Sequence, residues 1–399
     1  MKTLRSGRNR RKWIYVLLLM GLLGLSGCGS PSSASMEMSS QASTEADATV
    51  AEQTELVKTG SMELQYAENF TVDYYEGGYK LLTTLPDDKR YLLVPEGQGV
   101  PADLDEDICV LQEPLQNIYL VASGVMDMFA SVDAVDQIRF SGQKQENWYI
   151  QTAKDAMAAG DMIYAGKYSK PDYELLVSEG CDLAIENRMI THSPEVVEML
   201  QSFDIPVMIE YSSYEQHPLG KVEWVKFFGA LTGREAEAEE AFAEQTEILE
   251  EVESGEKTGK TIAFFYVTSN GLIQVRQSTD YIPKLIELAG GRYIFEDLED
   301  SGSGRSTLNM QVEDFYAGAK DADILIYNSS IDGGVTTVDE LIGKCNILKD
   351  FKAVQEGQVY CTTNDMYQQS MAIGYLLQDM HTVLTDDDTA KLRYLFLLQ

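Results

Sequence analysis

Histidine and cysteine are scarce in this chain of 399 residues, which has three histidines and five cysteines. The cysteines lack Cys-x-x-Cys spacing and have no pair of histidines nearby, so a zinc or redox cluster is not indicated. A site for free zinc or manganese needs three or four His and carboxylate ligands, and the histidines are only His192, His217 and His381. We therefore expect neither a metal site nor a cofactor. A single disulfide stays open among Cys109, Cys181, Cys345 and Cys361.

Basic residues are also few, since 31 Lys and Arg stand against 64 Asp and Glu and give a net charge of −33. So acidic a surface repels phosphate backbones, which excludes nucleic acid as a partner. The sequence also lacks Gly-x-Ser-x-Gly, P-loop, Gly-x-Gly-x-x-Gly and His-Glu-x-x-His motifs, so we expect a protein that is not an enzyme. With 44% hydrophobic residues, the chain has enough apolar side chains for about two domains.

The N-terminal segment is a separate element, because residues 1–27 hold six basic residues and no acidic one. The thirteen nearly apolar residues from Trp13 to Leu25 are too few to span a bilayer comfortably. The Leu-Ser-Gly-Cys sequence that ends at Cys28 resembles the lipobox of bacterial lipoproteins, in which the cysteine sulfur receives a diacylglycerol. We expect a signal peptide at 1–27, a lipid on Cys28, and a protein anchored to the outer face of the cell membrane.

After this segment the composition changes to Ser, Ala, Thr, Glu and Gln, with no aromatic residue as far as about Gly60. Such a stretch cannot build a core. Residues 28–60 are therefore expected to be the lipidated cysteine and a disordered tether.

From about residue 61 onward, short β-branched or aliphatic runs alternate with amphipathic stretches, which predicts βα units. The expected strands are Tyr91–Val94, Ile118–Val121, Asp182–Glu186 and Pro206–Glu210 in the first half, and Thr261–Val267, Arg292–Phe295, Asp323–Tyr327 and Gln358–Cys361 in the second. Each half also has a helix with an early glutamate followed by an Asp-led strand. We therefore expect two similar α/β lobes, at 61–215 and 257–399.

The segment 216–256 between the two halves has a different pattern. Pro218 suits the first turn of a helix, and apolar residues recur at helical spacing as far as Gly233. The run Arg234–Glu253 then places an apolar stripe opposite many glutamates. A helix of about twenty residues spans about 30 Å, so we expect this segment to join the lobes as a rigid connector.

This order of elements resembles the periplasmic-binding-protein family that serves importers of iron–siderophores, cobalamin and haem. The resemblance covers roughly residues 80–380, and no single stretch in it is a catalytic signature. The stretches that carry it are Asp172–Leu176 through Ile185, Tyr211–Gly220 before Glu223-Trp224, and Val275-Arg276 through Asp280-Tyr281 to Ile286–Gly291.

The resemblance implies a class III substrate-binding protein, with two Rossmann-like lobes joined by a single long helix. Such a protein is expected to hold a bulky metal chelate or a corrinoid between its lobes, as a monomer, and to deliver it to an ABC permease. Glu174 and Glu313 match the two acids that dock on the permease in this family. Alternatively, each is an exposed first-turn glutamate favoured by the helix dipole.

Ligands of open α/β sheets lie beyond the carboxyl ends of the strands, so the loops that follow the strands should line the cleft. These loops are rich in aromatic and polar groups, which suit a large, oxygen-rich, anionic ligand. The expected ligand-binding residues are Trp148, Tyr149, Arg188, Tyr214, His217, Arg276 and Tyr367. The alternatives are that Trp148 and Tyr149 pack under the following helix and that His217 only caps a turn.

We expect an iron–siderophore chelate as the ligand, mainly because of the arginines. Cobalamin and haem are the alternatives within the same family. Outside it, a surface adhesin that interacts with the cell wall and a protein that binds zinc or manganese directly are the remaining interpretations.

Overall fold

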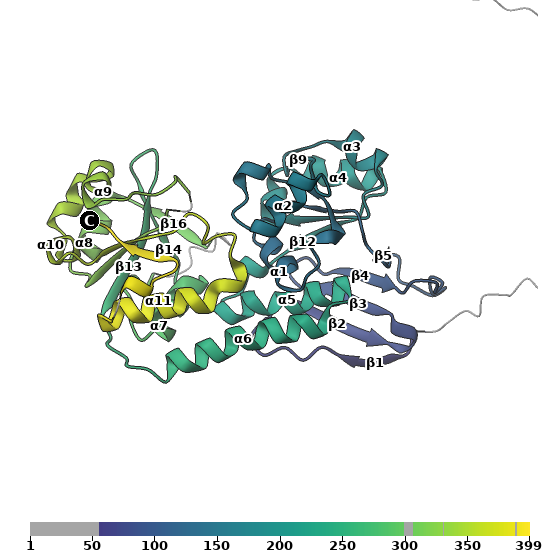
Figure 1. Cartoon of the computed structure of the whole chain (residues 1–399), viewed down its shortest axis with the longest axis horizontal. Coiled ribbons are helices and arrows are strands. Elements are labelled where there is room, and N and C mark those ends of the chain that lie inside the picture. Colours follow the sequence, from purple (N-terminus) through teal and green to yellow (C-terminus); the bar gives the residue numbers. More distant parts are fainter. Residues whose placement is uncertain (1–55, 299–305, 330, 388) are drawn as a thin grey trace, which may run out of the picture. The chain divides into compact units, whose positions relative to one another are not determined.

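The computed structural model describes residues 56–298, 306–329, 331–387 and 389–399 (Figure 1). These residues all belong to one compact unit, 51–399. The expected signal peptide, Cys28 and all but the last five residues of the expected tether lie outside the described residues. Among the described residues, no helix has the length and apolar character that crossing a membrane requires.

A parallel sheet forms the centre of the first lobe. Its strands are β6 (Ile118–Leu120), β7 (Ile138–Ser141), β8 (Ile163–Tyr164), β11 (Leu183–Asn187) and β12 (Val207–Glu210), in the order β12-β11-β6-β7-β8. Between them run α1 (Val125–Ser131), α2 (Gln151–Ala159), the short hairpin β9 (Gly166–Lys167) and β10 (Lys170–Pro171), α3 (Tyr173–Ser178) and α4 (Pro194–Ser202). Three of the expected strands therefore fall on β6, β11 and β12, whose buried residues pack against helices as parallel strands require.

The second lobe is built on a seven-stranded mixed sheet. Its strands are β13 (Thr261–Val267), β14 (Ile273–Arg276), β15 (Arg292–Tyr293), β16 (Thr307–Met310), β17 (Ile324–Tyr327), β18 (Val359–Thr362) and β19 (Leu395–Leu397). The strands β15, β13, β17 and β18 pair in parallel, and β14, β16 and β19 are antiparallel to their neighbours. Its helices are α7 (Tyr281–Leu288), α8 (Val312–Ala319), α9 (Val338–Lys344), α10 (Lys352–Glu356) and α11 (Ile373–Thr385). All four strands expected in this half are present.

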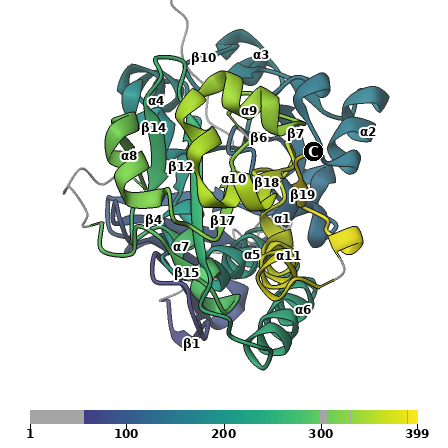
Figure 2. The same cartoon turned by 90° about the vertical axis from the view of Figure 1, so that its left-hand side faces the viewer.

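Two helices form the connector between the lobes. Helix α5 (Pro218–Thr232) starts with Pro218 in its first turn and ends at Gly233, whose φ of 70° suits glycine. Helix α6 (Glu235–Glu253) turns back against it, and Gly229 allows this close approach because a Cβ there would lie 2.5 Å from the Cβ of Ala238. Figure 1 shows α6 running along α5 below both lobes, and in Figure 2, turned by 90°, the two helices again lie side by side.

A second mixed sheet precedes the first lobe, which the sequence did not predict as a separate sheet. Its strands are β1 (Lys58–Ser61), β2 (Phe70–Tyr75), β3 (Lys80–Thr84), β4 (Lys89–Val94) and β5 (Ile108–Gln112), in chain order, antiparallel except for the parallel pair β4–β5. The strand expected at Tyr91–Val94 belongs to this sheet and not to the sheet of the first lobe. Strand β1 also begins inside the range expected for the tether, because it pairs with β2.

Two buried carboxylates, on α5 and on the turn before it, fasten this N-terminal sheet to the rest of the fold. The Glu223 carboxylate accepts the backbone N–H groups of Gln65, Tyr66 and Ala67 at 2.8–3.1 Å. The Glu215 carboxylate accepts those of Glu68 and Asn69 at 2.9 and 3.0 Å, and also the Trp224 indole N–H at 2.9 Å. The sheet is therefore an integral part of the folded body, held through hydrogen bonds to charged groups.

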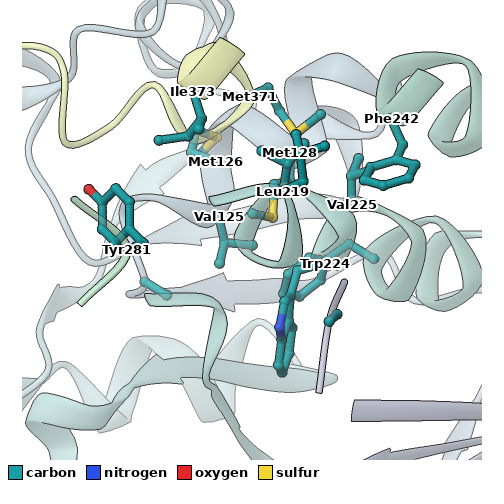
Figure 3. Close-up of a cluster of buried hydrophobic side chains, with 14 of the residues drawn as sticks. Val125, Met126, Met128, Leu219, Trp224, Val225, Phe242, Tyr281, Met371 and Ile373 are labelled. Atoms are coloured by element: carbon teal, nitrogen blue, oxygen red, sulfur yellow. The ribbon is translucent and has the colours of Figure 1, made fainter. Parts of the chain in front are cut away.

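The largest core surrounds α5 and draws side chains from both lobes. Figure 3 shows Val125, Met126 and Met128 of α1 near Leu219, Trp224 and Val225 of α5, together with Phe242, Tyr281, Met371 and Ile373. Helix α5 is buried almost all round, which explains its apolar composition.

Candidate ligand-binding cleft

A cleft of about 490 Å³ lies where strands β6, β11 and β12 end. The loops after these strands supply most of its lining, as expected for an α/β sheet. Tyr367 and Ser370 reach it from the second lobe, and Lys221 reaches it from α5. Its lining residues are Ala122, Ser123, Gly124, Asn187, Arg188, Met189, Thr191, His192, Glu210, Ser212, Ser213, Tyr214, Lys221, Tyr367 and Ser370.

A smaller cavity of about 220 Å³ shares part of this lining. Ser213, Tyr214, Lys221 and Tyr367 belong to both spaces. The smaller cavity adds residues of the second lobe, namely Arg276, Asp280, Tyr281, Ser306 and Met366. The two spaces therefore adjoin around Lys221, and residues from both lobes line them.

Three cationic side chains line the combined space. The Arg188 guanidinium lies over the Tyr214 ring, 4.5 Å from its centroid. The Lys221 ammonium lies 4.7 Å from the Tyr281 ring centroid, and among the described residues no carboxylate is within ion-pair distance of it. Arg276 pairs with Asp280 at 3.3 Å, and although burial alone would lower the pKa of Arg276, the Asp280 carboxylate raises it. The cleft therefore gathers three basic side chains in a protein that is otherwise strongly acidic.

The acidic groups of the cleft are held by neighbouring donors. The Glu210 carboxylate accepts the Ser212 N–H at 2.8 Å and its hydroxyl at 2.6 Å, and burial raises the pKa of Glu210. The Asp280 carboxylate caps α7 by accepting the Ile282 N–H at 2.9 Å. The lining of the two spaces thus holds three cationic side chains and two carboxylates, of which Asp280 is paired with Arg276.

Comparisons with known proteins identify the fold. The sequence profile described as periplasmic binding protein matches residues 121–366. This chain belongs to the periplasmic binding protein family. Residues 56–120, which include the whole N-terminal sheet, precede the matched range.

Among its relatives are two uncharacterised lipoproteins of Methanocaldococcus jannaschii. One is 24% identical over 93% of this chain and 92% of its own length, and the other is 23% identical over 90% of both. Similar solved structures include an ABC-type Fe3+-hydroxamate transport system from Saccharomonospora viridis, 16% identical over 68% of this chain and 93% of that chain, with a TM-score of 0.54. The periplasmic haem-binding protein HutB of Vibrio cholerae is 14% identical over 67% of this chain and 98% of that chain, with a TM-score of 0.53. The solved structures confirm the class III two-lobed fold, and the family match agrees with the binding protein expected from the sequence.

This periplasmic binding protein brings together four of the seven residues expected to bind ligand. Arg188, Tyr214 and Tyr367 line the main cleft, and Arg276 lines the adjoining cavity. Tyr149 lies beside them, since its ring meets the Tyr367 ring edge-on with centroids 6.4 Å apart.

The other two expected ligand residues have partners within the fold. Trp148 is 1% exposed and its indole N–H donates to the Ser141 hydroxyl at 3.0 Å, so it packs in the core of the first lobe. The Nδ1 atom of His217 accepts the Leu219 N–H at 3.2 Å and caps α5, and its ring stacks on Tyr66 with centroids 4.4 Å apart. Burial lowers the pKa of His217, which keeps it neutral for this role. These contacts agree with the alternatives that the sequence left open, namely packing for Trp148 and capping of a turn for His217.

Sequence reasoning missed Lys221, the buried cation shared by both cavities. It lies three residues after Pro218, one turn into a helix whose remaining residues are almost all buried. Its place in a mainly apolar segment could have identified Lys221 as a candidate site residue, because a buried amine needs a functional or electrostatic reason.

Metal-ligating groups do not gather in the described part of the chain, where no three His, Cys, Asp or Glu side chains could hold one ion. Cys109, Cys181, Cys345 and Cys361 are all free thiols. Burial raises the pKa of Cys181 to about 12 and that of Cys361 to about 11, so both remain protonated. They fit small buried side chains better than reactive ones.

The two expected docking acids occupy equivalent places in the two lobes. Glu174 lies in the first turn of α3 and Glu313 in the first turn of α8, and both side chains are exposed. Neither lines the cleft described above.

Proposed function

We propose that this protein is a lipid-anchored, extracytoplasmic substrate-binding protein that captures an anionic iron chelate of the siderophore type for an ABC importer. The observation that carries the proposal is the group of three cations, Arg188, Lys221 and Arg276, in adjoining cavities of a protein with net charge −33. Such a concentration of positive charge is expected where carboxylate, hydroxamate or catecholate oxygens must be held.

The size and lining of the space support the same ligand class. Cavities of about 490 Å³ and 220 Å³ adjoin, which is within the range of sites for small molecules and cofactors. The rings of Tyr214 and Tyr367 are partly exposed and can cover flat ligand surface, while Ser and Thr hydroxyls offer hydrogen bonds.

Delivery would use the two exposed acids at the ends of α3 and α8. Glu174 and Glu313 would pair with basic residues of the permease, one on each lobe. The lipid on Cys28 would keep the protein at the membrane surface where the permease lies, and Cys28→Ser should release it from membranes into the soluble fraction.

The binding step can be tested by intrinsic fluorescence. A ferric hydroxamate siderophore, haemin and cobalamin would each be titrated into the purified protein, because a coloured ligand in the cleft quenches nearby aromatic emission. We expect saturable quenching by the ferric siderophore, weakened at least about tenfold by Lys221→Met, as loss of a hydrogen bond to a charged group implies. Lys284→Met, at a partly exposed lysine of α7 that lines neither cavity, is the matched control. Saturable quenching by none of the three compounds would contradict the proposal.

Haem is the second candidate, because His192 and Met189 line the cleft on the turn after β11. Imidazole and thioether side chains are ligands of haem iron. If haemin binds with a Soret band that shifts in His192→Ala, and the siderophore does not bind, haem replaces the siderophore as the ligand. Protein-bound zinc or manganese found by elemental analysis would instead support direct metal binding.

A further inference from the structure

Large apolar side chains are exposed on helices α3 and α4 of the first lobe. Val177 is 48% exposed, and Met199 and Phe203 are each 44% exposed. Other exposed apolar residues, Met189, Tyr214 and Tyr367, line the cleft and are accounted for there. Exposed large side chains that gather on one face of a soluble protein usually mark a contact surface.

The residues on the two helices form one continuous patch. Tyr173 and Val177 are four residues apart on α3, so they share a face, and Met199 and Phe203 have the same spacing at the end of α4. The Tyr173 and Phe203 rings join the two faces, with centroids 6.0 Å apart. We call Tyr173, Val177, Met199 and Phe203 the α3–α4 patch, and Figure 1 shows both helices in the upper part of the first lobe.

The two helices that carry the patch are anchored in the core of the first lobe. Leu176 of α3 and Leu200 of α4 point inward and are fully buried in the core of the first lobe. The exposed side chains are therefore presented on ordered helices, so little conformational freedom would be lost when a partner covers them.

Every charged side chain of helices α3 and α4 is acidic. Glu174, Glu195 and Glu198 are exposed on the same two helices, which carry no lysine or arginine. Within the described residues, none of these three glutamates takes part in an ion pair. A partner that fits must present an apolar surface with basic residues around it. A second copy of this chain or an anionic membrane would place like charges together.

We infer that the α3–α4 patch is the anchor by which the first lobe docks on the permease. This inference rests on the proposed function, because Glu174, one of the two proposed docking acids, is three residues from Val177. In the second lobe, helix α8 carries Glu313 without a comparable patch, since Phe315 is buried and Val312 and Tyr316 are partly buried. The first lobe therefore supplies apolar contact together with charge, and the second lobe mainly charge.

Photocrosslinking in cells of the source organism tests the partner directly. A benzoyl-phenylalanine replaces Phe203 in the full chain, and in a control it replaces Tyr164, an aromatic of β8 in the same lobe that is 40% exposed. We expect position 203, and not position 164, to crosslink to a membrane-embedded permease subunit, identified by mass spectrometry. A crosslink from 203 to a second copy of the chain or to a protein of another class, or no crosslink at all, would overturn the inference.

Uptake separates this inference from the proposed function. Val177→Asp combined with Phe203→Asp should lower cellular uptake of the radiolabelled ferric siderophore at least about tenfold, as loss of an interface anchor implies, while the fluorescence titration of the purified variant stays unchanged. If the unaltered protein binds no chelate, the proposed function fails. If binding is normal and uptake by the patch variant is also normal, while reversal of Glu174 and Glu313 abolishes uptake, only the patch inference fails.

Discussion

Gln368 of the second lobe holds the backbone of Tyr149 of the first lobe, because its side-chain carbonyl accepts the Tyr149 N–H at 2.8 Å. Its amide donates to the Asn147 carbonyl at 2.8 Å and to the Tyr367 hydroxyl at 3.0 Å, and the side chain is fully buried. The Asp127 carboxylate adds a second tie by accepting the Met371 N–H at 2.7 Å. The lobes are thus joined beside the cleft as well as through the connector.

Gln368→Ala should loosen this tie, since it removes the hydrogen-bond partners of Tyr149 and Asn147. We expect the free energy of unfolding to fall by about 1–3 kcal/mol, the cost of leaving buried polar groups unpaired. Denaturant unfolding measures this loss, and hydrogen exchange should show faster exchange of the Tyr149 amide. Gln369→Ala is the control, because no hydrogen bond of its side chain occurs among the described residues. Equal stability and equal exchange in the two variants would contradict the assignment.

Glu223 of the buried helix α5 should contribute strongly to the stability of the fold. Glu223→Gln keeps the shape of the side chain but replaces one of the two carboxylate oxygens that receive the N–H groups of Gln65, Tyr66 and Ala67. We expect a loss of about 2–3 kcal/mol in the free energy of unfolding, because hydrogen bonds to charged groups are strong. The control is Glu239→Gln, at an exposed glutamate that pairs with Lys226 at 2.9 Å, as Glu223 does at 3.6 Å. Similar small losses in both variants would show that the N-terminal sheet does not depend on this carboxylate.

The parts of the fold that the sequence predicted well have strong local signals. The strand expected at Thr261–Val267 has those bounds in the structure, because its β-branched and aromatic run is almost wholly buried. In the N-terminal sheet only β4 was expected, because β2 and β3 have polar, partly exposed residues and depend on pairing with each other. The attachment of this sheet through Glu223 joins residues more than 150 positions apart, which no local pattern reveals.

The sequence placed in the cleft those residues whose position follows from the order of the strands along the chain. Arg188 and Tyr214 follow parallel strands, so both had to lie at one edge of the sheet. Chain order does not predict the direction in which a side chain points. Trp148 follows a strand of this sheet, but its side chain turns inward and donates to Ser141. Lys221 reaches the cleft from a helix, and only the packing of α5 beneath both lobes places it there.

Charge reversal at the two proposed docking acids should separate binding from transport. We expect Glu174→Lys combined with Glu313→Lys to abolish uptake of the ferric siderophore and to leave its affinity for the purified protein unchanged, because neither residue lines the cleft. If each acid only interacts with its helix dipole, the variant should lose about 0.3–1 kcal/mol of stability per site and transport normally. Reversal of two other exposed glutamates, Glu237 and Glu356, controls for the change in net charge. Normal uptake by the Glu174 and Glu313 variant would reject the docking assignment.

The buried Glu186 of β11 should make stability depend on pH. Both oxygens of its carboxyl group are buried and have no hydrogen-bond partner, and burial raises the pKa of Glu186 to about 8. Since the unfolded value is about 4.3, the folded protein keeps a proton that the unfolded chain loses between these pH values. The free energy of unfolding should therefore fall as the pH rises from about 4 to about 8, by up to about 1.4 kcal/mol per pH unit from this group.

Glu186→Gln should remove this dependence, because the amide is uncharged at every pH. The variant should match the unaltered protein near pH 4 and become increasingly more stable than it up to about pH 8, with no further gain above that value. Urea unfolding of both proteins at several pH values measures the difference, and Glu198→Gln, at an exposed glutamate of α4, serves as the control. A difference in stability that stays constant between about pH 4 and about pH 8 would mean that folding does not raise the pKa of Glu186, and would contradict this prediction.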